Sequence, residues 1–156
     1  MRSARLDFAD PEQPVSLAEV DPPALPGADW VRVRVLAGGI CGSDLHAIHP
    51  DGTGSPTMLP LVGFPMELGH EIGGVVVETG PDARTPVGTR VAVDPGLYCA
   101  PQGLPPCPAC AAGRFSSCRN LNVDGRGFGH GFAAGVGGGW SDELVAHDEH
   151  GRTRVR

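Results

Sequence analysis

The sequence contains no lysine, and this absence bears on the partners that the chain can bind. All twelve basic residues are arginines scattered along the 156 residues, and the formal net charge is −6. A nucleic-acid-binding domain gathers its positive charge in a patch or stripe. We therefore expect no nucleic-acid partner.

Long apolar runs are also missing. A membrane span needs about 18 consecutive apolar residues, and residues 1–14 lack the apolar core of a secretory signal. We therefore expect a cytoplasmic protein with no membrane partner. In that reducing compartment, clustered cysteines are more often metal ligands than disulfides.

Glycine and proline are abundant, and they separate short runs of β-branched side chains. The run at 30–36 alternates valine with arginine, a period of two that predicts a half-buried strand. The segment 41–49 is expected to form helical turns. The expected strands cover 15–20, 30–36, 70–79, 88–94 and 140–146. The stretch 50–68 is expected to be a loop. Short strands separated by turn signals predict a single mainly β domain, a barrel or a sandwich.

Four of the five cysteines lie close together in a proline-rich stretch. They are Cys99, Cys107, Cys110 and Cys118, spaced C-x7-C-x2-C-x7-C. Four thiolates suit a closed tetrahedral structural zinc site. The segment 95–120 has little apolar content, so we expect a lobe without regular structure that gains its folding energy from the metal. A redox C-x-x-C pair or four unrelated core cysteines are the alternatives, but a redox pair normally opens a helix after a strand.

A second group of chemistry-bearing residues lies in the motifs CGSDLH and GHE. Its members are Cys41, Ser43, Asp44, His46, His70 and Glu71. A thiolate combined with an imidazole suits a catalytic zinc that keeps one coordination position open. Ser43 is placed to pass a proton outward, and Asp44 to accept a hydrogen bond from a ligand imidazole. Taken singly, a free cysteine is more often inert packing, and a histidine a satisfied core residue.

Together the two groups resemble the zinc-dependent medium-chain dehydrogenases, the alcohol dehydrogenase family. The segments that carry this resemblance are GGICGSDLH, LGHEIGGVVVETG, VGTRVAVDP, the four-cysteine lobe and GGWSDELVAH, in this order. The resemblance implies that 1–156 form a GroES-like, partly open β-barrel with short helices and a structural zinc lobe at 95–120. It also implies that Cys41 and His70 are ligands of a catalytic zinc, with Glu71 as a nearby carboxylate.

The reaction implied by the resemblance is oxidation of a primary or secondary alcohol or a polyol by hydride transfer to NAD or NADP. Ser43 and His46 match the family's proton relay, and Asp44 matches the partner of the ligand histidine. The third protein ligand and the dinucleotide fingerprint follow the matched part in that family. We therefore expect the substrate-side half of an enzyme, with the Rossmann cofactor domain absent and the isolated chain inactive.

Three features depart from the family pattern or imitate another one. The lobe begins C-x7-C where the family has C-x2-C, so Gln102 to Pro106 is interpreted as an insertion. The loop between the two motifs is long and is expected to border the substrate cleft. The run GVGGG at 135–139 precedes a strand and does not join a strand to a helix, so we interpret it as a flexible turn rather than a cofactor loop.

Two other classes of function stay open at this point. One is a non-catalytic zinc-binding domain, and the other is an interaction protein like the co-chaperone that shares the barrel. A co-chaperone needs neither cysteine cluster, and fold alone is a poor guide to function. The sequence is also compatible with a homo-oligomer, and it does not identify the substrate or choose between NAD and NADP.

Overall fold

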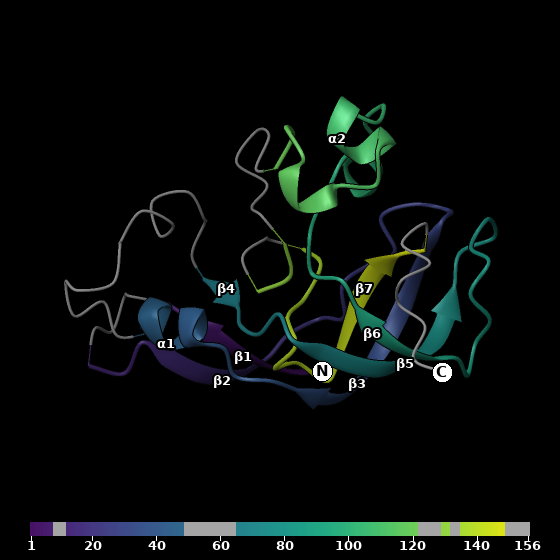
Figure 1. Ribbon diagram of the computed structural model, residues 1–156. Coiled ribbons are helices and arrows are strands. Elements are labelled where there is room, and N and C mark those ends of the chain that lie inside the picture. Colours follow the sequence, from purple (N-terminus) through teal and green to yellow (C-terminus); the bar gives the residue numbers. More distant parts are fainter. Residues whose placement is uncertain (8–11, 49–64, 122–128, 132–134, 149–156) are drawn as a thin grey trace.

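Two antiparallel β-sheets and a separate lobe make up the computed structural model, which describes residues 1–7, 12–48, 65–121, 129–131 and 135–148 (Figure 1). The first sheet has the strand order β2-β1-β4, and the second has the order β6-β5-β3-β7. The strands are β1 (Arg2–Leu6), β2 (Val15–Glu19), β3 (Trp30–Gly38), β4 (Met66–Glu67), β5 (Ile72–Thr79), β6 (Arg90–Val93) and β7 (Glu143–His147). The helices are α1 (Gly42–Ile48) and α2 (Pro108–Ala111), with the 3-10 turns η2 (Ala100–Gln102) and η3 (Phe115–Ser117). The sheets stay open, and the predicted mainly β fold is confirmed.

The expected strands all form, with ends that differ by a few residues from those predicted. β1 and β4 were not expected. β1 has one large apolar residue, Leu6, and it forms a strand because β2 and β4 pair with it on both sides. β4 falls inside the stretch expected to be a loop, and residues 49–64 lie outside the described residues.

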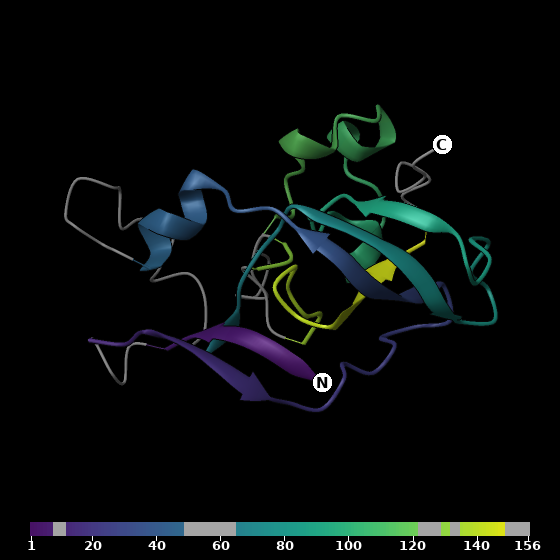
Figure 2. The ribbon, with the colours of Figure 1, turned by 90° about the horizontal axis from the view of Figure 1, so that it is seen from below.

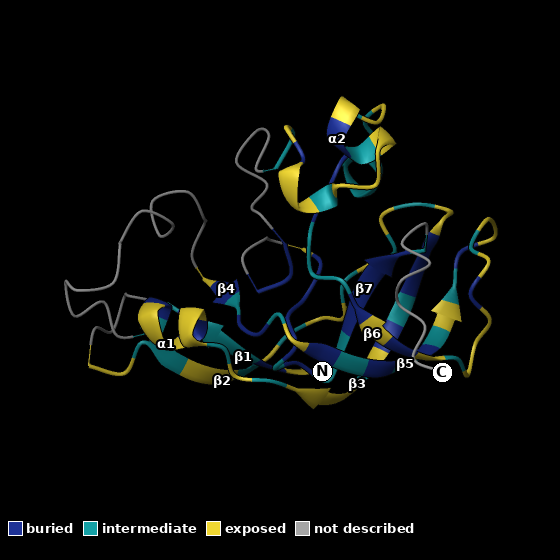
Figure 3. Ribbon diagram, in the orientation of Figure 1, coloured by how far each residue is buried: buried dark blue, intermediate teal, exposed yellow. Residues whose placement is uncertain are grey.

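The alternating pattern of β3 places its valines in the core of the second sheet. Val31 and Val33 are buried, whereas Arg32 on the opposite face donates from Nε to Glu78 Oε2 at 2.7 Å. The valines pack with residues of β5, β6 and β7, namely Ile72, Val76, Val91, Val93, Leu144 and Ala146. Figure 3 shows the same concentration of buried residues in the strands of the second sheet and the more exposed surface of the lobe.

A second apolar cluster joins α1 to the first sheet. Leu6, Ala47, Met66 and Leu68 are buried together, and the half-buried Trp140 packs against them. Ala47 and Asp44 are the buried residues of α1, so this helix is held by one narrow face.

The GVGGG segment at 135–139 turns as expected, but it is not a loose surface connection. Gly135 and Gly137 have φ values of 81° and 82°, yet residues 136–139 are buried. A Cβ at Gly138 would overlap the carbonyl of Leu68. The glycines therefore allow two backbones to pack directly against each other.

The lobe projects from the sheets in both views (Figures 1 and 2). The expectation that it lacks regular structure is wrong, because it contains α2 and two 3-10 turns. Pro108 follows the N-cap residue Cys107 of α2, where its fixed φ and missing N–H favour a helix start. Among the described residues, no helix combines the length and apolar character that crossing a membrane requires.

A buried histidine makes the stability of this fold sensitive to pH. His130 is 2% exposed, and its Nε2 and Nδ1 atoms lie 2.8 Å and 3.3 Å from the carbonyl oxygens of Val145 and Pro95. Burial lowers the pKa of His130 below its ordinary value of 6.5. As the pH falls through this ordinary value, the unfolded chain takes up a proton that the folded chain refuses. Stability is therefore full above this pH and is lost below it.

We expect His130→Gln to reduce this loss, because the amide can donate to Val145 without titrating. Between about pH 7 and pH 5, the free energy of unfolding of the parent chain should fall more steeply than that of the variant. The difference is bounded by about 1.4 kcal/mol per pH unit for one group. Urea unfolding at both pH values measures it, and parallel pH profiles would contradict the prediction.

Candidate metal centres

The structure brings Cys41, His70 and Glu71 into one cluster. Cys41 immediately precedes α1, and the other two residues lie between β4 and β5. One ligand-type atom of each residue lies within 4.8 Å of those of the other two. Cys41 and His70 are half-buried and Glu71 is exposed, so the cluster is open on one side.

Asp44 connects two members of this cluster. Its carboxylate is fully buried. Oδ2 accepts a hydrogen bond from the backbone N–H of Cys41 at 2.9 Å, and Oδ1 lies 3.4 Å from Nδ1 of His70. In the first of these contacts, a carboxylate in the first turn of the helix accepts a hydrogen bond from the backbone N–H of the residue before the helix, as in a capping box. Because Nδ1 faces Asp44, Nε2 is the ring nitrogen left for a metal.

The hydroxyl of Ser43 lies on the other side of the imidazole. Its Oγ is 3.3 Å from Nε2 of His70, and the residue is exposed. His46 is exposed one turn further along α1. In the described part of the chain, the hydrogen bonds of this site reach Ser43 and do not extend to His46.

The donor set fits a zinc ion. A thiolate, an imidazole and a carboxylate are among the ligands that Zn²⁺ takes in catalytic sites. A ligand histidine with its second nitrogen on a carboxylate is the usual outer arrangement.

The four lobe cysteines form the second cluster, with their sulfur atoms all within 4.8 Å of one another. Cys99 and Cys118 are buried, and their sulfur atoms lie 3.6 Å apart. Zn–S bonds of about 2.3 Å in a tetrahedron place sulfur atoms about 3.8 Å apart, far beyond a disulfide bond of about 2.05 Å. All five cysteines of the chain are free thiols. The structure therefore groups Cys99 with the other three despite the insertion that follows it.

Asn120 is a part of the lobe that sequence reasoning missed. Its side-chain amide donates to Cys99 Sγ at 3.2 Å and its backbone N–H to Cys118 Sγ at 3.4 Å. Gln102, within the inserted stretch, donates to the carbonyl oxygens of Leu97 and Asn120, both at 2.6 Å. The position of Asn120, two residues after the last cysteine, was the available signal. N–H donors of this kind stabilise charged sulfur.

The thiols of the lobe differ in acidity. Backbone N–H groups, that of Arg119 foremost, lower the pKa of Cys107 to about 6. Burial raises the pKa values of Cys110 and Cys118. Zinc must displace protons from the latter two thiols, so the affinity of the lobe for zinc falls as the pH falls.

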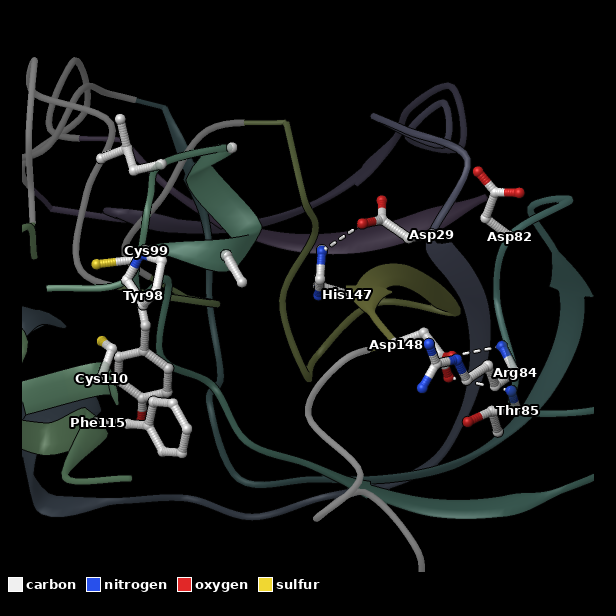
Figure 4. Close-up of a pocket in the computed structure, with 14 residues that line it drawn as sticks. Asp29, Asp82, Arg84, Thr85, Tyr98, Cys99, Cys110, Phe115, His147 and Asp148 are labelled. Atoms are coloured by element: carbon white, nitrogen blue, oxygen red, sulfur yellow. Dashed lines mark hydrogen bonds and ion pairs between the residues drawn. The ribbon is translucent and has the colours of Figure 1, made fainter. Parts of the chain in front are cut away.

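A cavity of about 860 Å³ separates the lobe from the second sheet. Figure 4 shows Tyr98 and Phe115 on one side and the pair formed by His147 and Asp29 on the other. In that pair, Nε2 of His147 lies 2.9 Å from Oδ2 of Asp29. Neither Cys41 nor the GHE motif lines this cavity, so it is distinct from the open cluster.

The fold and the two clusters define a class: a partly open β-barrel domain with one open mixed-ligand centre and one closed four-sulfur lobe. The sequence matches the profile of the family described as "Alcohol dehydrogenase GroES-like domain" over residues 27–154. The chain belongs to this family.

Characterised relatives and solved structures agree with this assignment. The chain is 38% identical over 115 residues to scyllo-inosose 3-dehydrogenase of Thermotoga maritima, covering 69% of this chain and 28% of that protein. It superposes with a TM-score of 0.74 and 27% identity on an alcohol dehydrogenase of Aeropyrum pernix, covering 96% of this chain and 38% of that one. A protein of Sinorhizobium meliloti bound to NADP and described as a "putative zinc-binding dehydrogenase" has a TM-score of 0.68 and 32% identity, covering 95% of this chain and 36% of that one. The chain thus spans under a third of the Thermotoga relative's length.

The lobe cluster predicts a strong dependence of metal content on Cys110. We expect Cys110→Ser to lose one zinc per chain and to lower the free energy of unfolding by more than about 2 kcal/mol, because the metal supplies folding energy. Elemental analysis and thermal unfolding measure the two effects. Cys41→Ser is the matched control, since it should leave the lobe zinc in place. A Cys110→Ser protein with its full zinc content would refute the prediction.

Proposed function

We propose that this chain is the substrate-side, zinc-binding domain of a zinc-dependent NAD(P) alcohol or polyol dehydrogenase. The observation that carries the proposal is the open cluster of Cys41, His70 and Glu71, with Asp44 behind the imidazole and Ser43 in front of it. The relatives support it, because one is named a scyllo-inosose 3-dehydrogenase and another an alcohol dehydrogenase. The substrate is therefore proposed to be a small alcohol or polyol.

In the proposed centre, Cys41 Sγ and His70 Nε2 would hold the zinc, and Glu71 would occupy or leave a third position. When bound, the ion supplies Lewis-acid polarisation of the substrate oxygen. Asp44 keeps the proton of the imidazole on Nδ1 and so directs the Nε2 lone pair into the cluster. The lobe cysteines 99, 107, 110 and 118 would hold a second, structural zinc.

Ser43 is the proposed first acceptor of the proton that leaves the substrate hydroxyl. Its Oγ lies beside the cluster and is exposed to solvent, so it can take a proton on one side and release it on the other. His46 follows one turn later on the same helix and is proposed as the outer member of this relay. The proposed step from Ser43 to His46 therefore spans one turn of α1.

The nicotinamide cofactor is proposed to be held by a Rossmann domain outside these residues. The turn from β3 to α1 carries Gly39 and Gly42, but β3 is antiparallel to both of its neighbours and the turn holds Cys41. The frame that cradles a pyrophosphate is instead the first turn of a parallel βαβ unit. Gly138 and Gly139, in the segment that leads into β7, pack against Leu68 and Gly69. We propose that 1–156 form one domain with its lobe at 95–120. We also propose a cytoplasmic location, where reduced thiols persist.

A non-catalytic zinc domain remains the second candidate, favoured by the closed lobe, which needs no substrate. We expect the chain to bind two zinc ions of unequal affinity, the tighter in the lobe, because the open cluster offers fewer protein ligands. Metal titration against a chromophoric chelator measures both affinities. Two sites of equal affinity would contradict the ligand count, and a total of one ion would remove the open centre.

The activity test uses a fusion. The chain alone should not reduce NAD⁺ or NADP⁺ with any alcohol, since hydride transfer needs the nicotinamide held about 3–3.5 Å from the substrate carbon. Fused to the remaining portion of the Thermotoga relative, it should turn over, and Ser43→Ala should lower kcat by about a hundredfold. Ser16→Ala, exposed on β2, is the control. Turnover by the chain alone would contradict the proposal, and an inactive fusion carrying both metals would favour the non-catalytic domain.

A further inference from the structure

We propose that Trp140 is a positioning residue of the open centre and that its indole sets the distance between the segments that carry Cys41 and His70. The inference rests on the proposed function, because the metal centre is what the indole positions. Trp140 lies outside both sequence motifs of the centre, and its hydrogen bonds in the described part of the chain join Gly39, Leu68 and Ala4. Its effect would be transmitted through backbone that directly precedes the ligands.

The first contact reaches the segment of Cys41. The indole N–H of Trp140 donates to the carbonyl oxygen of Gly39 at 2.8 Å. Gly39 follows the last residue of β3 and precedes Cys41 by two positions. The bond therefore fixes the chain at the point where it leaves the sheet and turns into α1.

The second contact reaches the segment of His70. Gly69 has a φ of 89°, and a Cβ there would lie 2.5 Å from Cδ1 of the indole. The backbone adds two hydrogen bonds, from Trp140 N–H to Leu68 O at 3.0 Å and from Gly139 N–H to Gly69 O at 2.7 Å. Gly69, the residue directly before His70, is thus held by the indole of Trp140 and by the backbone of residues 139–140.

The third contact reaches Glu71 through Gly39. The N–H of Gly39 donates to the carbonyl oxygen of Glu71 at 2.7 Å, and a Cβ at Gly39 would overlap the carboxylate of Glu71. The side chain of Glu71 therefore lies directly over Gly39. A displacement of Gly39 would move Glu71 together with Cys41.

The indole also packs on the cluster that seats α1, which includes Ala47. That helix carries Ser43 and Asp44. The side chain of Trp140 therefore contacts the segments on which the residues of the centre are placed. Packing alone would be met by a phenylalanine. The N–H bond to Gly39 is the part that only tryptophan provides, and it separates a positioning role from a packing role.

The test replaces Trp140 by Phe and compares zinc and cobalt binding with that of the parent chain. We expect the affinity for the weaker ion to fall by about tenfold or more, the range seen when an outer partner of a metal ligand is removed. The affinity for the tighter ion should stay unchanged, and the cobalt absorption spectrum of the weaker site should shift. The lobe thus serves as an internal control in each titration.

Trp30→Phe is the matched control. Trp30 is the only other tryptophan of the chain, 5% exposed in a separate cluster with Leu97, Val136 and Val145. Its replacement should cost stability and leave both metal affinities unchanged. In that variant Trp140 is the sole tryptophan, and its fluorescence should respond to cobalt at the weaker site.

Should Trp140→Phe fail to fold, a tryptophan isostere with sulfur in place of the N–H, inserted at position 140, keeps the shape and removes only the donor. Unchanged affinity for the weaker ion in a folded variant would overturn the inference and leave the proposed centre intact. An equal loss at both sites would also overturn it, as a general loss of packing. A parent chain that binds one ion only would overturn the centre and the inference together.

Discussion

The direct approach of backbones at glycine is the constraint on which the arrangement of this domain depends. Backbone N–H groups of residues 139–142 donate hydrogen bonds to the carbonyl oxygens of Leu68 and Gly69. Carbonyl oxygens of the same segment accept hydrogen bonds from Ala4 of β1 and Val35 of β3. These bonds connect the two sheets, and beside them the chains approach too closely for a side chain at two glycines. A Cβ at Gly38 would overlap the carbonyl of Gly139, and one at Gly138 the carbonyl of Leu68. The glycines therefore allow backbone to pack directly on backbone inside the domain. The open centre lies beside these contacts, because Cys41 and His70 follow them closely in sequence.

The two cysteine-containing clusters differ in how much of their geometry the surrounding fold supplies. The open cluster is built on strand ends and on a capped helix, which are held by apolar packing around Leu6 and Leu68. The lobe has only a small cluster of its own, around Tyr98 and Phe115, whose rings lie 5.2 Å apart. Its short helices and N–H···S bonds converge on the four sulfur atoms. The barrel thus supplies the geometry of the open cluster, whereas the lobe has little support besides its four sulfur atoms and their N–H donors.

Much of this arrangement could be predicted from the sequence, because it depends on local patterns. The alternating valines of β3 predicted which face of the strand lies in the core. Cys41 and His70 lie together in one cluster, and the four lobe cysteines form another. β1 could not be foreseen, since its strand character comes from partners on both sides and not from its own side chains. Trp140 and Asn120 were missed for a similar reason. Trp140 donates to Gly39, which is more than a hundred positions away in the sequence. Asn120 donates to Cys99, about twenty positions away.

The way the ligand segments are held has a consequence for how such domains diverge. Residues 38–39, 69 and 139–140 fix the ends of the chain that leave β3 and enter β5, and none of them belongs to the sixteen residues from 49 to 64. Lengthening a connection whose ends are already fixed is inexpensive, at about 0.6 kcal/mol for each doubling. Insertions between α1 and β4 can therefore accumulate without disturbing Cys41, His70 or Glu71.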